Sequence, residues 1–154
     1  MEAGGGMAQM EAWQAALRHP ALLHLLATAG ALWLLSRAKR SLWLLSLVAL
    51  PGTLCHELCH HLTGLLLNGQ PQRFTVLPRR EGNRWILGSV SLANARWYNR
   101  FFIGLAPLLL LPAAAALWLW RAHAGPTLSW AEAAWIYLIA NLLFAALPSL
   151  EDLR

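Results

Sequence analysis

His56-Glu57-Leu58-Cys59-His60 lies inside a long apolar run, and the interpretation of the chain starts from it. Glu57 is the only formally charged residue between Ser41 and Gln72. A carboxylate in a membrane-like segment costs roughly 2.5–3.5 kcal/mol or more, so its presence there indicates a function. Two histidines four residues apart lie on one face of a helix, where both can bind one zinc ion. The glutamate beside the first histidine is then placed to accept a proton from a zinc-bound water.

The composition places this motif in a membrane protein. Hydrophobic residues make up 58% of the 154 residues and charged residues only 12%, whereas soluble domains have about 25% charged residues. The net charge of +5 does not indicate nucleic-acid binding, because the basic residues cluster at the ends of apolar runs, as membrane anchors do. Several of the nine tryptophans also fall near these ends, where aromatic belts form.

Four apolar segments predict an all-α integral membrane protein with about four transmembrane helices, since about 20 helical residues cross the hydrocarbon core. These segments cover residues 19–36, 41–67, 101–120 and 133–150. We expect residues 1–17 to form an amino-terminal tail and residues 18–154 to form a single membrane-embedded domain. Pro51-Gly52 predicts a break or kink about one turn before His56, of a kind that membranes tolerate where the freed backbone lines a cavity. The same break could also make the start of the second segment partly re-entrant.

The loop between the second and third segments, residues 71–98, has strand character. Phe74 to Leu77 and Trp85 to Leu92 are rich in residues that favour strands, and Pro78 and a basic Gly/Asn turn separate them. This pattern is typical of a β-hairpin.

The distribution of Lys and Arg predicts the orientation of the four spans. With four spans, the amino terminus, the hairpin and the carboxyl terminus share one side, which carries eight basic residues: Arg18, Arg73, Arg79, Arg80, Arg84, Arg96, Arg100 and Arg154. The other side carries four, of which Arg37, Lys39 and Arg40 follow the first span. The count favours a cytoplasmic amino terminus, hairpin and carboxyl terminus, with the site opening toward the cytoplasm. The small size and the lack of a targeting signal favour a bacterial plasma membrane.

Catalytic zinc takes three protein ligands and a water, so the motif needs a third ligand. The side chains that could supply it are His24, Cys55, Cys59, His61, His123, Glu151 and Asp152. His61 points about 100° away from His60 around the helix, which disfavours it. Asp152 follows the fourth span about three helical turns after Asn141, and Pro148 between them would unwind the helix and turn the carboxylate inward. Cys55 and Cys59 are expected to be reduced, because the i, i+4 spacing on one helix gives poor disulfide geometry.

An H-E-x-x-H motif in an apolar helix, followed by a hairpin and an apolar helix with the pattern N…PSxxD, resembles the site-2-protease-like intramembrane zinc metalloproteases. The resemblance covers roughly residues 41–154. It implies one zinc per chain, bound by His56, His60 and Asp152, with Glu57 as the general base. It also implies that Asn141 helps to hold substrate, and that the substrate is a membrane protein whose unwound segment pairs with the hairpin edge. The family usually has glycine after the aspartate, where this chain has Leu153.

Three other functions fit parts of the pattern. A non-catalytic metal-binding scaffold of the same fold would keep the histidines without the hydrolysis. A haem-binding membrane protein would use His24, His56, His60 or His123, although the cysteine spacing fails the C-x-x-C-H pattern for covalent haem. A metal-ion transporter needs polar groups along several spans, and residues 101–120 offer none. The oligomeric state and the identity of the substrate stay open.

Overall fold

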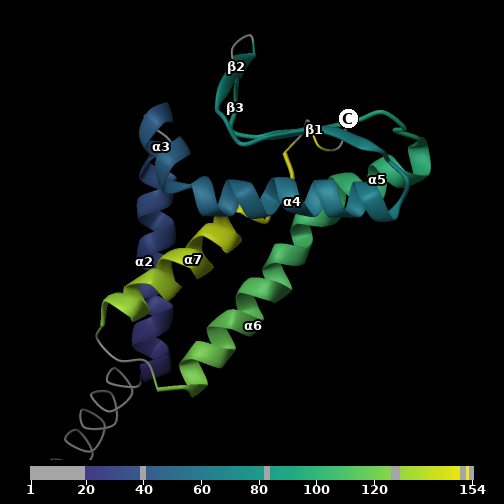
Figure 1. The fold of residues 1–154 in the computed structure, drawn as a ribbon. Helices are drawn as coiled ribbons and strands as arrows, with labels where there is room; N and C mark the ends of the chain where they lie inside the picture. The colour runs from purple at the N-terminus through teal and green to yellow at the C-terminus, as the bar shows by residue number, and fades with distance from the viewer. Residues whose placement is uncertain (1–19, 39–40, 82–83, 126–128, 150–151, 153–154) are drawn as a thin grey trace, which may run out of the picture.

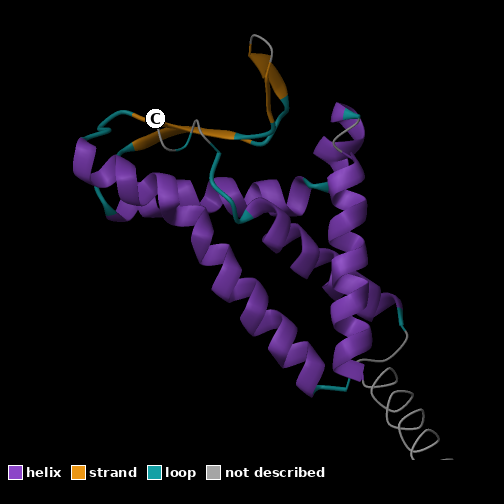
Figure 2. Ribbon diagram, turned by 180° about the vertical axis from the view of Figure 1, so that it is seen from behind, coloured by secondary structure: helices purple, strands orange, loops and turns teal. Residues whose placement is uncertain are grey.

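The computed structural model describes residues 20–38, 41–81, 84–125, 129–149 and 152, and it is mostly helical with two small antiparallel sheets. Figure 1 shows the order of the elements, and Figure 2 shows from behind that the strands gather at one end of the helices. The expected amino-terminal tail, residues 1–17, lies outside the described residues. The helices are α2 (Pro20–Ala38), α3 (Leu42–Val48), α4 (Leu50–Leu66), α5 (Trp97–Leu105), a 3₁₀ turn η1 (Ala106–Leu109), α6 (Leu110–His123) and α7 (Trp130–Ala145).

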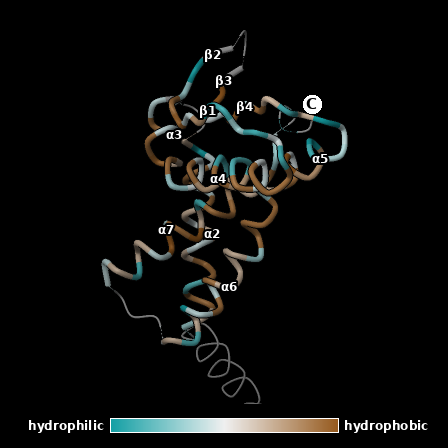
Figure 3. The backbone as a smooth tube through the Cα atoms, turned by 45° about the vertical axis from the view of Figure 1, so that its right-hand side comes forward, coloured by the Kyte–Doolittle hydropathy of each residue, from teal (hydrophilic) through white to brown (hydrophobic). Residues whose placement is uncertain are grey.

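Two helical segments among the described residues are long and apolar enough to cross a membrane. They are α2 and the continuous stretch Trp97–His123, while α7 is apolar but shorter. Figure 3 shows hydrophobic colour along α2, α6 and α7 and more hydrophilic colour in the strands at one end. Large apolar side chains such as Leu34 and Trp33 point outward from α2. The membrane character expected from the composition is therefore supported for these segments.

The second apolar segment of the sequence forms two helices rather than one. The chain leaves helical geometry at Ala49 (φ −93°, ψ 2°), between α3 and α4. Pro51 lies in the first turn of α4, where main-chain N–H groups have no partner within the helix. Proline, which has no N–H, therefore costs no hydrogen bond there. The expected break is thus present two residues before Pro51, and α4 runs at a steep angle to α2 (Figure 1).

Close packing of α4 against α7 depends on Gly52. A Cβ atom at this position would lie 2.5 Å from the carbonyl oxygen of Asn141, a contact that no side chain could make without moving α7. The neighbouring core contains Leu110, Ala114, Ile139, Leu142 and Ala146, from α6, α7 and the residue that follows α7. The sulfur-bearing side chains of Cys55 and Cys59 pack against this core and are unbridged.

The predicted hairpin is present as a bent ribbon of four strands. β1 (Pro71–Thr75) pairs with β4 (Ser89–Leu92), and β2 (Arg79–Glu81) pairs with β3 (Arg84–Ile86), both antiparallel. Three residues, 76–78, connect β1 to β2, whereas only two residues, 87–88, connect β3 to β4. The unequal lengths break the pairing, so the two sheets do not continue as one ladder. The β2–β3 part therefore bends away from β1–β4, which lies over α4 (Figure 1).

Candidate metal centre

The two histidines of the motif face each other across one turn of α4. Their Nε2 atoms lie 3.1 Å apart. The Nδ1 atom of His56 lies 2.6 Å from the carbonyl oxygen of Ala145, and that of His60 lies 2.8 Å from the carbonyl oxygen of Ile103. A carbonyl oxygen can only accept, so both Nδ1 atoms carry the hydrogen and both Nε2 atoms of the neutral rings present lone pairs to the same point. This arrangement is the usual outer hydrogen bond of metal-binding histidines.

Asp152 brings a carboxylate to the same point. Its Oδ2 lies 3.4 Å from Nε2 of His56, and its Oδ1 lies 3.4 Å from Nε2 of His60. The helix α7 ends at Ala145, and the chain after it curves back so that the main-chain N–H of Ser149 donates to Oδ2 of Asp152. Burial opposes ionisation of Asp152, but hydrogen bonds from His56 and His60, when their rings are protonated at Nε2, and from Ser149 outweigh it and hold the pKa of this carboxyl well below its ordinary value.

The spacing of these three groups fits a tetrahedral zinc ion. Zinc binds imidazole nitrogen and carboxylate oxygen at about 2.0–2.2 Å, which places neighbouring ligand atoms roughly 3.3 Å apart in a tetrahedron. The two Nε2 atoms lie 3.1 Å apart, and each lies 3.4 Å from a different oxygen of Asp152, so two of the three separations have this size when either oxygen is the ligand. His56, His60 and Asp152 could together hold a metal ion, with all their ligand atoms within 4.8 Å of one another. Three protein ligands also leave a fourth position open, which is the pattern of catalytic zinc sites.

Glu57 lies beside the centre without joining the group of ligands. Its side chain lines the same cavity as the three ligands, and the residue is only 5% exposed. The bend between β3 and β4 covers it, because a Cβ atom at Gly88 would lie 2.5 Å from Oε1 of Glu57. The main chain at Gly88 therefore contacts the carboxylate directly.

An open cavity of about 1,150 Å³ surrounds the centre. Its walls come from α4, the β3–β4 bend, α5 and the segment after α7. Ser89, Val90 and Leu92 of β4 line it, whereas the residues of β1 do not. Each strand pairs with only one other described strand, so β4 has an unpaired edge as well as side chains on the cavity wall. Small-molecule sites occupy about 300–1,000 Å³, so this cavity has room for a larger, extended ligand.

Asn141, expected to contact substrate, lies in the helix interface instead of on the cavity wall. The residue is fully buried. Its Oδ1 accepts a hydrogen bond from the main-chain N–H of Gly52 at 3.3 Å, and its Nδ2 donates to the carbonyl oxygen of Tyr137 at 3.1 Å. Its observed contacts join α4 to α7, and its role toward substrate stays a prediction.

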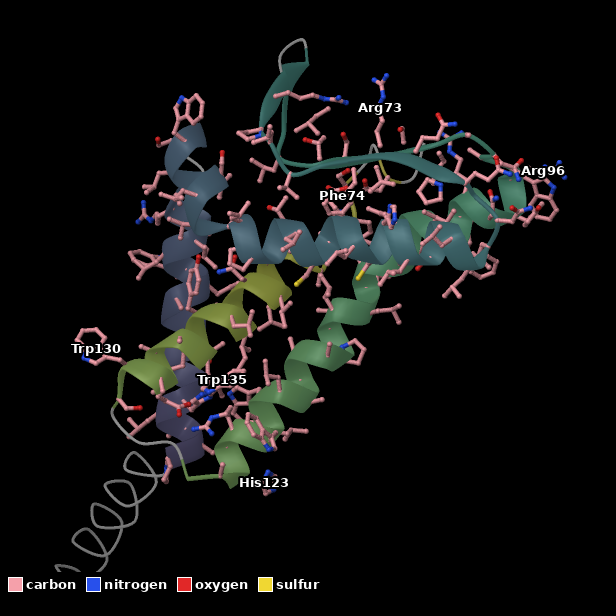
Figure 4. The ribbon with its side chains drawn as sticks, in the orientation of Figure 1. Arg73, Phe74, Arg96, His123, Trp130 and Trp135 are labelled. Atoms are coloured by element: carbon pink, nitrogen blue, oxygen red, sulfur yellow. The ribbon has the colours of Figure 1, made fainter. Side chains whose placement is uncertain are left out.

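The structure also places the other side chains considered as third ligands. The ring of His61 stacks edge-on against Phe74 of β1, with ring centroids 5.8 Å apart. His24 lies 2.7 Å from Oε1 of Glu132, and His123 contacts the carbonyl oxygen of its own helix at Leu119. Figure 4 shows Phe74 above α4 and His123 at the opposite end of the molecule. Cys55 and Cys59 pack in the core, and Glu151 lies outside the described residues.

Sequence reasoning did not identify three contributors to the site. The carbonyl groups of Ala145 and Ile103 hold the histidine rings, and Gly88 contacts the glutamate. The first two act through the main chain, so no side-chain pattern marks them. Gly88 was visible only as a glycine within a strand pattern, a feature that often marks close approach of another group.

Comparisons with known proteins add no relative: no protein-family model, no curated protein and no solved structure matches the chain.

Proposed function

We propose that this protein is an intramembrane zinc metalloprotease of the site-2-protease type, which hydrolyses peptide bonds in or near the transmembrane segments of other proteins. The observation that carries the proposal is the convergence of His56, His60 and Asp152 at separations that suit tetrahedral zinc, beside a buried glutamate. Asp152 is 92 residues from His60 in the sequence, so short-range helix geometry does not account for the meeting.

The residues present fit a bound zinc ion and a hydrolytic role for Glu57. When bound, zinc supplies Lewis acidity, which polarises a carbonyl oxygen and lowers the pKa of water. Glu57 is the general base that takes a proton from the attacking water and later returns it to the leaving amine. Main-chain contact at Gly88 holds the carboxylate on the cavity side of α4.

The cavity and the strand edge support an extended peptide as substrate. Peptide recognition by strand addition uses an unpaired sheet edge for main-chain hydrogen bonds and pockets for alternate side chains. The outer edge of β4 meets both needs, since Ser89, Val90 and Leu92 also line the cavity. A transmembrane helix has its main-chain groups paired internally, so the substrate segment has to unwind before it can pair with β4.

The experiment is a cleavage assay of the detergent-purified protein on fluorescein-labelled casein, an unfolded chain able to add as a strand, combined with elemental analysis for zinc. We expect one zinc per chain and label release in the wild type. Glu57→Gln should keep the zinc and cleave at least about 100-fold more slowly, which is the lower end of the range for a positioned acid–base group. Glu81→Gln makes the same substitution in β2, at a residue that is neither a ligand nor the proposed base, and serves as the matched control.

Three outcomes would contradict the proposal. Cleavage by Glu57→Gln at the wild-type rate would show that this residue is not the base. A zinc-loaded wild type that cleaves neither casein nor a co-reconstituted single-span membrane protein would favour the non-catalytic metal-binding scaffold. A Soret absorption band in the purified protein would instead favour haem.

A further inference from the structure

A buried polar cluster fixes one end of the helical bundle. Glu132 in the first turn of α7 forms an ion pair with Arg121 in the last turn of α6, and its other oxygen lies 2.7 Å from Nε2 of His24 in α2. His24 is 2% exposed and Glu132 is 5% exposed. The early part of α2, the end of α6 and the start of α7 therefore meet at one end, which makes α2 parallel to α7 and α6 antiparallel to both.

The metal centre lies at the opposite end of the same helices. His56 contacts the carbonyl oxygen of Ala145, the last residue of α7, and His60 contacts that of Ile103 in α5. From Glu132 to Ala145 the helix α7 rises about 20 Å, a large part of the roughly 30 Å hydrocarbon core. Because α2 is parallel to α7, the carboxyl end of α2 at Ala38 belongs to the metal end.

The segment between α2 and the hairpin, which contains α3 and α4, leaves the metal end of the bundle and comes back to it. The hydroxyl of Tyr137, in the middle of α7, donates to the carbonyl oxygen of Val48 at 2.7 Å. Three contacts then follow at a constant separation of 89 residues: Val48 with Tyr137, Gly52 with Asn141 and His56 with Ala145. The first half of α4 thus advances along α7 toward the metal end. Figure 1 shows α3 beside the end of α2 and α4 crossing the bundle at a steep angle, so the chain runs back from Ala38 through α3, turns at Ala49 and follows α7 to the metal end.

Basic residues are concentrated at the metal end. The described ones there are Arg37 in the last turn of α2, Arg73, Arg79, Arg80 and Arg84 in the strands, and Arg96 and Arg100 around the start of α5. Among the described residues, the opposite end carries Arg121, whose charge Glu132 balances. Figure 4 shows Arg73 and Arg96 at the metal end, and His123 and Trp130 at the other. Lys39 and Arg40 directly follow α2 in the sequence.

We propose that the chain crosses the membrane three times, through α2, α5–α6 and α7, and that Leu42–Leu66 is a re-entrant segment that enters and leaves on the cytoplasmic side. Basic residues are retained on the cytoplasmic side, where the leaflet is rich in anionic lipid. The metal centre then opens toward the cytoplasm and the amino terminus lies outside. The inference rests on the membrane setting of the proposed function. It differs from the four-span expectation, which places residues 37–40 and the hairpin on opposite sides.

Accessibility of single introduced cysteines distinguishes the two arrangements. Ser41→Cys, Gln72→Cys and Ala124→Cys place a thiol before α3, in the hairpin and after α6, at exposed positions. Each full-length variant is expressed in a Gram-negative host and treated with a membrane-impermeant maleimide, before and after permeabilisation. Labelling of the wild type measures the background from Cys55 and Cys59. Wild-type zinc content in each variant shows that it has folded.

The three-span arrangement predicts that Ala124→Cys reacts in intact cells, whereas Ser41→Cys and Gln72→Cys react only after permeabilisation. Labelling of Ser41→Cys in intact cells, with Gln72→Cys still protected, would overturn it in favour of four spans. Labelling of both of these with Ala124→Cys protected would overturn the cytoplasmic orientation. Recovery of the protein in the soluble fraction would instead remove the membrane setting itself. The readout does not depend on cleavage, so a failed protease assay leaves this result intact.

Discussion

Gly88 and Glu57 are in direct contact: a Cβ atom at Gly88 would lie 2.5 Å from Oε1, 2.6 Å from Cγ and 2.8 Å from Cδ of the glutamate. Real side chains do not pack at such distances, so only glycine allows the β3–β4 bend to lie on this carboxylate. The contact covers the proposed base from the hairpin side, while His56 and His60 flank it on α4.

Gly88→Ala should therefore displace Glu57 or lift the bend. Misplacement by about 1 Å of a catalytic group costs roughly 100-fold in rate, so we expect kcat to fall by about 10- to 100-fold. Zinc content should not change, because the atoms nearest to a Cβ at position 88 belong to Glu57, which is not one of the three ligands. The rate of casein cleavage at saturating substrate checks the first expectation, and elemental analysis checks the second. Gly30→Ala, where an added Cβ meets nothing within 4 Å, is the control. A wild-type kcat in Gly88→Ala would show that the contact is dispensable.

Asp152→Ala should release the metal, since it removes one of three converging ligands. We expect zinc affinity to fall by more than the roughly 10- to 100-fold typical for loss of an outer-shell partner. The neighbouring carboxylate provides a matched control, because Glu151→Ala should keep the wild-type affinity. Competition with a chromophoric chelator measures both. The reverse result, zinc lost in Glu151→Ala and kept in Asp152→Ala, would move the third ligand to Glu151.

Gly52→Ala should destabilise the fold. The added Cβ would lie 2.5 Å from the carbonyl oxygen of Asn141, and that main-chain atom can move only with α7. Overpacking of this kind costs typically about 1–3 kcal/mol. Gly64→Ala on the same helix is the comparison, because its Cβ would come closest to the end of the Leu92 side chain, at 3.1 Å, which can turn aside, and would meet the Pro71 ring at an ordinary 3.7 Å. Thermal unfolding in detergent should show a clearly lower midpoint for Gly52→Ala. Equal midpoints for the two variants would contradict the tight α4–α7 contact.

Glu132→Leu should destabilise the far end of the bundle, because it leaves the half-buried Arg121 without its carboxylate partner. Breaking a buried ion pair from one side costs about 3–5 kcal/mol, whereas replacing both partners by apolar residues is often nearly neutral. The double variant Arg121→Met, Glu132→Leu should accordingly recover most of the lost stability. Zinc content should stay at the wild-type level in the single variant that still folds, as the metal centre lies at the other end. If the double variant instead lost the sum of the stabilities lost by the two single variants, Arg121 and Glu132 would not stabilise the fold as a pair.

The sequence predicted the centre because its chemistry is carried by side chains that are rare in apolar segments. His56, Glu57 and His60 stand out in an uncharged run, and Asp152 follows the last apolar segment with a proline just before it. Hydropathy also located the helices, but it records the length of an apolar segment and not its direction. Pro51-Gly52 predicted a break before His56, although residues 41–67 were counted as one span; the direction that α4 takes after Ala49 depends on its packing against α7 and could not be predicted.

The contacts missed by the sequence are those that pair distant residues or use the main chain. His24 and Glu132 are far apart in the sequence, and nothing in either neighbourhood indicates that they meet. Asn141 shows the complementary case: its type suggested a polar role in the membrane, but only packing reveals that its partners are Gly52 and Tyr137.

The carbonyl groups behind the two histidines have a consequence for how this protein can diverge. Natural selection substitutes side chains, and every residue type at positions 103 and 145 presents the same carbonyl oxygen if the helices keep their places. The orientation of both imidazole rings is thus insulated from substitution at these two positions. Descendants of this chain could change extensively in sequence around the centre and still keep its geometry, with little sequence similarity left at these positions.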